Sequence, residues 1–180
     1  TSTITSTPAS ATFSIQRTST SPIGNFRIIK SNAFGGDGQT ALAKADFDAF
    51  PGFSAGSGMG SNVTDYCDDT IAASAWGTSN AYNTTAINLN STALSDMASN
   101  DFFILAIVNF DFDYKNVDSD PLFITQRLSH YTPDFSGTSR DPKIDYVTAG
   151  YSNNVIGVAS ADIAKVNGIA TADIEKIIGI

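Results

Sequence analysis

Apolar and polar residues alternate in several short segments of the chain. The clearest is residues 11–18, where Phe13 and Ile15 lie between Ser14 and Gln16. A period of two residues is typical of a β-strand that buries one face. The same reasoning predicts further strands over residues 25–30, 85–89, 122–130 and 141–148.

The longest apolar run is D-F-F-I-L-A-I-V-N-F-D-F-D-Y, residues 101–114. Its first half is continuously apolar, as in a strand that is buried on both faces. Its second half alternates aromatic residues with aspartates. The pattern therefore predicts one long strand over residues 101–114.

Other segments do not show strand periodicity. In N-S-T-A-L-S-D-M-A-S, Ser91 or Thr92 can cap a helix that carries Leu94 and Met97 on one face, so a short helix is predicted. Residues 52–61 are rich in glycine and predict a loop. Residues 40–50 are predicted to be irregular or a strand. Short strands separated by Gly, Asn, Ser and Pro turns predict an all-β fold, a β-sandwich with one short helix.

The last part of the chain repeats an eleven-residue unit. V-I-G-V-A-S-A-D-I-A-K covers residues 155–165, V-N-G-I-A-T-A-D-I-E-K covers 166–176, and I-I-G-I begins a third copy. Ser160 and Thr171 are suited to cap short helical turns, and the glycines interrupt any longer helix. Short helical turns linked by extended V-N-G-I pieces are therefore expected. The sequence predicts three parts: a flexible lead-in at 1–10, a sandwich body at 11–152, and a tail of short helical turns at 153–180.

Composition and charge limit the classes of function. Charged residues make up 16 % of the chain, so much of the polar surface must come from Ser, Thr and Asn. This favours an extracellular or particle-surface protein. The net charge is −8 and the ten basic residues are dispersed, which argues against nucleic acid and anionic membranes as partners. No apolar run is long enough to insert into a membrane.

Candidate catalytic residues are few, and we expect no enzyme. The G-F-S-A-G stretch at 52–56 fits the form of a nucleophile elbow, but no helix is predicted after it and His130 is the single histidine. The single Cys67 excludes an intrachain disulfide framework and is expected to be a small buried side chain. No cofactor is expected, apart from a structural calcium ion as one hypothesis.

Two kinds of ligand contact are candidates. Loop aromatics can stack on sugar rings, which makes Trp76, Tyr82 and Tyr131 candidate carbohydrate-binding residues; the alternative is that they cap the core. Carboxylate oxygens suit Ca²⁺, although this segment lacks the EF-hand pattern. The alternative is a solvated strand face and an acidic turn. The candidate calcium ligands are Asp111, Asp113, Asp118 and Asp120.

Two stretches resemble known families. The middle of the chain resembles the carbohydrate-binding-type jelly-roll domains of secreted cell-surface and phage proteins. The residues that carry this resemblance are Trp76, the segment from T-T-A-I-N-L-N to residue 114, and H-Y-T-P-D-F-S-G-T-S-R-D-P-K-I-D-Y-V-T. The likeness covers about residues 75–150. The tail resembles the V-N-G-V-A-x-A-x-I-x-K arrays of phage and marine-bacterial structural proteins. The resemblance implies a jelly-roll-like sandwich and a place in a virion or outside the cell.

The tail carries apolar residues that two and a partial repeat cannot bury on one another. The tail could pack on the sandwich body of its own chain, or it could dock onto other copies. The resemblance to particle proteins favours other copies. The residues concerned are Val155, Val158, Ile163, Val166, Ile169, Ile174, Ile177 and Ile178.

The sequence thus predicts a structural component of a phage virion, such as a decoration, tail or fibre protein, which assembles through its tail. Its partners would be further copies or other virion proteins. The alternatives are a carbohydrate-binding adhesion module that contacts a surface glycan, and a subunit of an extracellular surface filament.

Overall fold

The computed structural model describes residues 4, 6–18, 24–38, 40–53, 59, 62–77, 80–118, 129–132, 136–148, 165–166 and 169–170, and every structural statement below concerns these residues.

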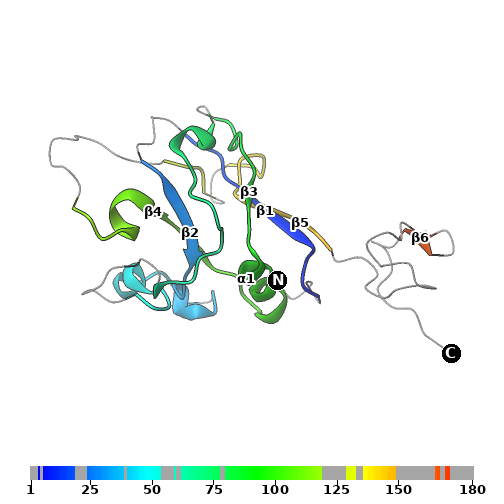
Figure 1. Cartoon of the computed structure of the whole chain (residues 1–180), viewed down its shortest axis with the longest axis horizontal. Helices are drawn as coiled ribbons and strands as arrows, with labels where there is room; N and C mark the ends of the chain where they lie inside the picture. Colours follow the sequence, from blue (N-terminus) through cyan, green and yellow to red (C-terminus); the bar gives the residue numbers. More distant parts are fainter. Residues whose placement is uncertain are drawn as a thin grey trace.

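Two small antiparallel sheets form the body (Figure 1). The first has the strand order β3(Ile87–Asn88), β1(Ser10–Ser14), β5(Lys143–Val147). Phe13 at its centre is opposite Ile87 on one side and Ile144 on the other. The second sheet pairs β2(Phe26–Lys30) with β4(Leu105–Asn109) over all five residues. The chain is therefore β-rich, as the sequence predicts.

The two sheets share one hydrophobic core. It contains Phe13 of β1, Phe26 and Ile28 of β2, and Met97 of the helix. The neighbouring Ile29 points to the opposite face of β2, where it packs in a second cluster with Val108 and Tyr114. Both Ile28 and Ile29 are fully buried, so β2 is covered on its two faces.

The predicted helix is confirmed as α1(Ser91–Ser99). Its cap, however, is Asn90, whose side chain accepts a hydrogen bond from the backbone N–H of Ala93 at 3.1 Å. The prediction that Ser91 or Thr92 caps the helix is wrong by one or two residues. Asn90 satisfies one of the free amides of the first turn, which is what a cap residue does.

The predicted long strand over 101–114 is wrong in its second half. The strand β4 ends at Asn109, and a π-helical turn, η5(Phe110–Tyr114), follows. The side chain of Asn109 accepts hydrogen bonds from the amides of Asp111 and Phe112 at 2.9 and 3.0 Å. This side chain turns the backbone out of the strand, and Phe110 then stacks on Tyr114 with 5.1 Å between ring centroids.

Three further short helical segments connect the sheets: η1(Phe34–Gly36), η2(Lys44–Asp48) and η4(Ala73–Trp76). The prediction of irregular or strand structure over 40–50 therefore misses η2. Its first turn is held by Asp46, whose carboxylate accepts from the amide of Ala43 at 2.8 Å.

In the tail the structure describes two short extended segments, β6(Lys165–Val166) and β7(Ile169–Ala170), which form an antiparallel pair with Val166 opposite Ile169. They lie at the V-N-G-I piece that was predicted to be extended, and the predicted helical turns lie outside the described residues. The predicted strand over 122–130 lies almost wholly outside the described residues. The strands predicted over 11–18, 25–30, 85–89 and 141–148 are confirmed as β1, β2, β3 and β5.

Candidate functional site

Trp76 is a core residue. Its side chain is 0 % exposed and packs edge-on against Phe26, with ring centroids 5.5 Å apart. A ring with no exposed surface cannot stack on a sugar, so the predicted sugar contact is corrected for Trp76. The alternative, an aromatic residue that fills the core, is the one the structure has.

Tyr82 and Tyr131 lie together on either side of Gln16. Tyr82 forms a β-bridge with Gln16, and the amide of Tyr131 donates to the carbonyl of Gln16 at 3.0 Å. Asn80 joins the group, because its carbonyl accepts from Gln16 Nε2 at 2.7 Å and its side chain accepts from the Tyr131 hydroxyl at 2.5 Å. Three loops far apart in sequence thus meet beyond the end of β1.

Cations cover one face of each tyrosine ring in this cluster. The guanidinium of Arg140 lies 4.7 Å from the ring centroid of Tyr131 and donates to its hydroxyl at 2.7 Å. Lys143 lies 5.4 Å from the ring centroid of Tyr82. Such contacts fix the orientation of a ring at a surface. Aromatic rings, an amide and a guanidinium can together bind hydroxyl groups of a sugar.

One polar atom in the tyrosine cluster has no partner among the described residues. Gln16 is 8 % exposed, and its Oε1 is buried without a hydrogen bond in the described part of the chain. A buried oxygen with no donor is costly, and a bound water or hydroxyl group would satisfy it.

The predicted calcium ligands are not brought together. The carboxylate of Asp111 accepts from the amide of Asn25 at 2.8 Å and from Lys115 at 3.2 Å; these donors, the amide first, lower the pKa of Asp111. Asp113 lines a groove by β4, and Asp118 is exposed. Asp120 is outside the described residues, among which no group of three or more His, Cys, Asp or Glu could hold a metal ion. A calcium ion stays a prediction.

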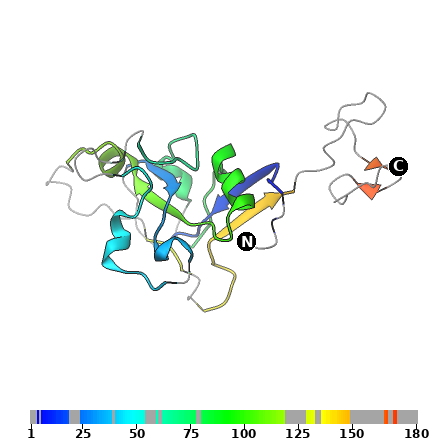
Figure 2. The same ribbon diagram turned by 90° about the horizontal axis from the view of Figure 1, so that it is seen from below.

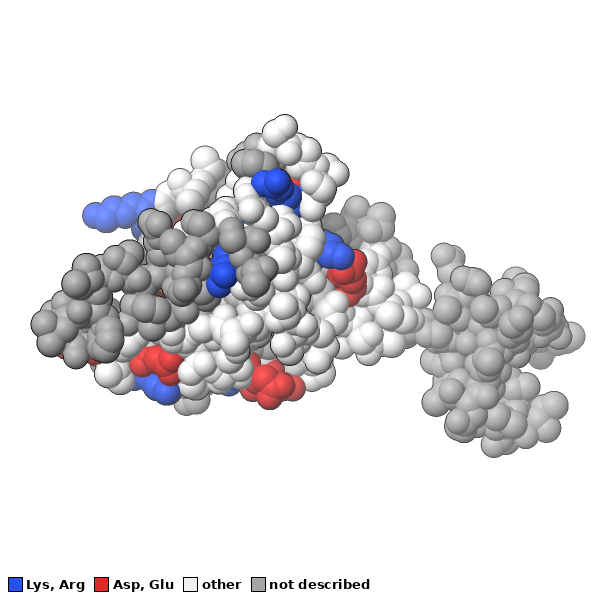
Figure 3. Space-filling view, turned by 90° about the horizontal axis from the view of Figure 1, so that it is seen from above, with Lys and Arg blue, Asp and Glu red and all other residues white. Residues whose placement is uncertain are grey.

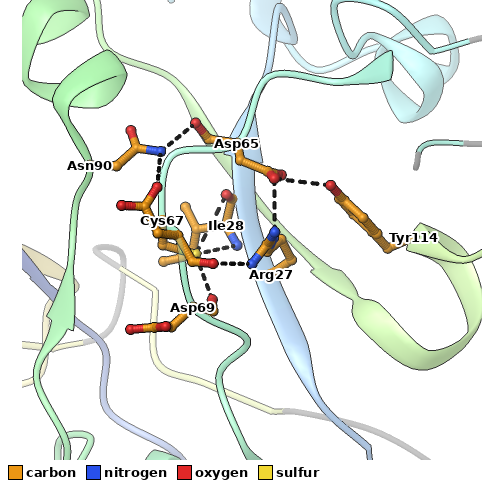
Figure 4. A network of polar contacts seen from close by, with 8 residues as sticks. Arg27, Ile28, Asp65, Cys67, Asp69, Asn90 and Tyr114 are labelled. Carbon is orange, nitrogen blue, oxygen red and sulfur yellow. Dashed lines mark hydrogen bonds and ion pairs between the residues drawn. The ribbon is translucent and has the colours of Figure 1, made fainter. Parts of the chain in front are cut away.

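A network of polar contacts joins β2 to the loop that carries Asp65 and Cys67, and to η5 (Figure 4). Arg27 donates to the carboxylate of Asp65 at 2.9 Å, and the Tyr114 hydroxyl donates to the same oxygen at 3.0 Å. Burial, and after it the bond to Asp65, raises the pKa of Tyr114. Cys67 beside them is buried, as predicted, and burial raises the pKa of its thiol. A buried thiol with a raised pKa is a poor nucleophile at neutral pH.

A large, mainly apolar groove runs along β4. All five consecutive residues from Ile104 to Val108 line it, together with Phe34, Phe50, Phe53 and Met59, and its volume is about 1060 Å³. A second hollow of about 670 Å³ adjoins it and shares Phe34, Ile104, Leu105 and Ile107. On the rim, Leu42 and Phe47 are 67 % and 83 % exposed.

Sequence reasoning missed this groove. The signal was present in the continuous apolar run before Asn109, which predicted a strand buried on both faces. In the structure β2 covers one edge of that strand, and the groove lies open beside it.

Basic side chains are dispersed over the described surface. On the face shown in Figure 3, Lys and Arg side chains stand apart from one another in mostly uncharged surface. None of the described helices is long and apolar enough to cross a membrane.

Most of the predicted assembly residues lie outside the described part of the chain. The exceptions are Val166 and Ile169, whose backbones pair in β6 and β7.

Comparison with known proteins finds no matching family model, no matching curated protein and no matching solved structure. The groove, the tyrosine cluster and the sequence of the tail are therefore the features of this chain that bear on function.

Proposed function

We propose that this chain is a non-enzymatic structural subunit that assembles with further copies through its repeat tail. The observation that carries the proposal is the apolar groove along β4, with Leu42 and Phe47 exposed on its rim. Soluble proteins rarely expose large apolar side chains together, unless the patch is covered by a partner. The tail supplies apolar side chains that also need cover.

The particle is proposed to be a phage virion, in which the chain would act as a decoration, tail or fibre protein. Low charge, abundant Ser, Thr and Asn, and the repeat that resembles tail arrays support this placement. For the body we propose a jelly-roll-like sandwich, supported by the antiparallel pairing of β1 with β5. A subunit of an extracellular filament would have the same features, and a virion is preferred for the tail's resemblance.

Truncation tests the proposed function. The molar mass of the whole chain is compared with that of a version ending at Ser152 by multi-angle light scattering over a range of concentrations. We expect the whole chain to form oligomers and the shortened version to be monomeric. An unchanged mass would overturn the proposal, provided that circular dichroism shows the same β-rich fold in both.

A second candidate function is carbohydrate binding at the tyrosine cluster. The observation that favours it is the meeting of Tyr82, Tyr131 and Asn80 around Gln16, whose Oε1 has no hydrogen bond from any described residue. Glycan-array binding by the whole chain should be lost in Tyr131→Ala. Tyr146→Ala is a matched control, because Tyr146 is an exposed tyrosine on β5 outside the cluster. No binding across a broad array, or equal loss in both variants, would exclude this function.

A further inference from the structure

The free edge of β4 is the feature that points to a partner. Its five residues pair with β2 on one side, and no strand pairs with it on the other side in the described part of the chain. Consecutive residues of a strand point to alternate faces, so a groove lined by all of Ile104 to Val108 runs along the edge of the strand. An unpaired edge beside apolar side chains is a template for an added strand.

The groove needs an apolar, extended occupant. Its lining is dominated by aromatic and aliphatic side chains, which give affinity by burial, while the edge of β4 offers backbone hydrogen-bonding groups. An edge of this kind is suited to a strand with Val or Ile on one face.

The tail provides such a segment. Residues 165–166 and 169–170 are already extended, and they bring Val166 opposite Ile169. A two-stranded ribbon this short is marginally stable by itself in water. On a larger sheet its apolar side chains would be buried and the backbone groups at its edges would form hydrogen bonds. The same sequence pattern recurs in each repeat of the tail.

We propose that the tail of one copy lies in the β4 groove of a second copy and adds a strand to the free edge of β4. This inference rests on the proposed assembly function and names its receiving site. Residues 148–164 separate β5 from β6, and fully extended they span about 55 Å, enough to reach a neighbour. Figures 1 and 2 show that the described parts of β5 and β6 are joined only through residues drawn in grey. The tail's resemblance to arrays of particle proteins, which assemble symmetrically, favours a second copy over the same chain.

Cross-linking between two distinguishable chains tests the proposal. A chain with Phe47→Cys and one tag is co-expressed with a full-length chain carrying Ile169→Cys and another tag, and the mixture is oxidised. We expect a disulfide-linked band that contains both tags. The native Cys67 is buried, so the unsubstituted chain serves as the background. The matched control replaces Phe47→Cys by Val117→Cys, because Val117 is 55 % exposed and does not line the groove.

Two substitutions on the rim give an independent measure. Leu42→Ser and Phe47→Ser change exposed side chains, so the fold should be kept, whereas the contact would lose two apolar groups. The concentration at half-assembly should rise by about tenfold or more for each substitution, the factor expected for one buried aliphatic or aromatic side chain.

The outcomes separate the two proposals. A further chain carries both Phe47→Cys and Ile169→Cys. If it forms the disulfide within itself at high dilution, and no disulfide forms between the two singly substituted chains, the groove holds the tail of its own chain. A band of equal strength with Val117→Cys would show unspecific contact; either result overturns the inference. If truncation at Ser152 gives monomers while neither cross-linking nor the rim substitutions has an effect, the tail docks elsewhere and the assembly function stands. If the whole chain is monomeric, the assembly function itself fails.

Discussion

At the scale of single residues, Trp76 is a core side chain whose ring packs against Phe26. We predict that Trp76→Ala lowers the free energy of unfolding by about 3–5 kcal/mol, because it removes a large buried side chain and leaves a cavity. Urea denaturation followed by circular dichroism measures this. Trp76→Phe keeps part of the packing and should cost clearly less. A stable Trp76→Ala protein would contradict the core position.

Asp96 links stability to pH. Its carboxylate accepts from Lys30 at 2.8 Å and from the Tyr66 hydroxyl at 2.7 Å. Burial alone would raise the pKa of Asp96, but these donors outweigh it and hold that pKa below its ordinary value. The folded state then binds fewer protons than the unfolded state around pH 4, so acid favours unfolding.

We therefore expect the free energy of unfolding to decline as the pH falls from about 5 toward 2. In Asp96→Asn the decline should be shallower, because one group with a lowered pKa is gone. Denaturant titrations at several pH values measure the slope. Asp69→Asn, an exposed carboxylate, is the control and should change the slope less. Equal slopes in the native protein and Asp96→Asn would contradict the role of Asp96.

At the scale of elements, Asn109 decides where β4 ends. Its side chain accepts from two backbone amides of the following turn. Asn109→Ala should lower the free energy of unfolding by about 1 kcal/mol or more, the usual cost of a lost cap. Asn88→Ala, at an exposed strand position, is the comparison. Chemical denaturation of both variants tests this, and equal stability of both would refute the capping role.

Gly52 occupies a turn that no other residue fits. Its φ is +88°, and a Cβ there would lie 1.7 Å from the carbonyl oxygen of Asn62. Gly36 has φ +77° but open space around it. We expect Gly36→Ala to cost about 1–2 kcal/mol for the left-handed backbone alone. Gly52→Ala should cost distinctly more, because the backbone must also move. Thermal unfolding of the pair separates the two effects.

The elements were predictable where one periodicity decided them. Strict alternation identified β1 and β5, and the Leu94 and Met97 spacing identified α1. The prediction failed at residues 110–114. Aromatic residues that alternate with aspartates are compatible both with a strand and with a π-helical turn, and in the turn Phe110 stacks on Tyr114. One side-chain cap, Asn109, decided between them, and periodicity does not register a cap.

At the scale of the whole molecule, the site was harder to predict than the elements. The loop-aromatic signal selected Tyr82 and Tyr131, which meet around Gln16, but it also selected the buried Trp76. Whether an aromatic residue fills the core or faces solvent depends on what packs against it, which is a tertiary property. The groove also depends on tertiary structure. The apolar sequence of β4 predicts a buried strand, but it does not indicate which edge of that strand pairs with a neighbour.

The net charge of −8 gives a final prediction about assembly. Copies of an acidic chain repel one another, whereas the proposed contact between tail and groove is apolar. Added salt screens the repulsion and leaves the apolar contact intact or stronger. We therefore expect the concentration at half-assembly to fall when sodium chloride is raised from about 0.02 M to about 0.5 M, a range in which the screening length shortens several-fold. Light scattering over a dilution series at each salt concentration measures this, with the version ending at Ser152 as a control that stays monomeric throughout. Dissociation by salt would instead show that ion pairs hold the copies together, and the apolar groove would then not be the receiving site.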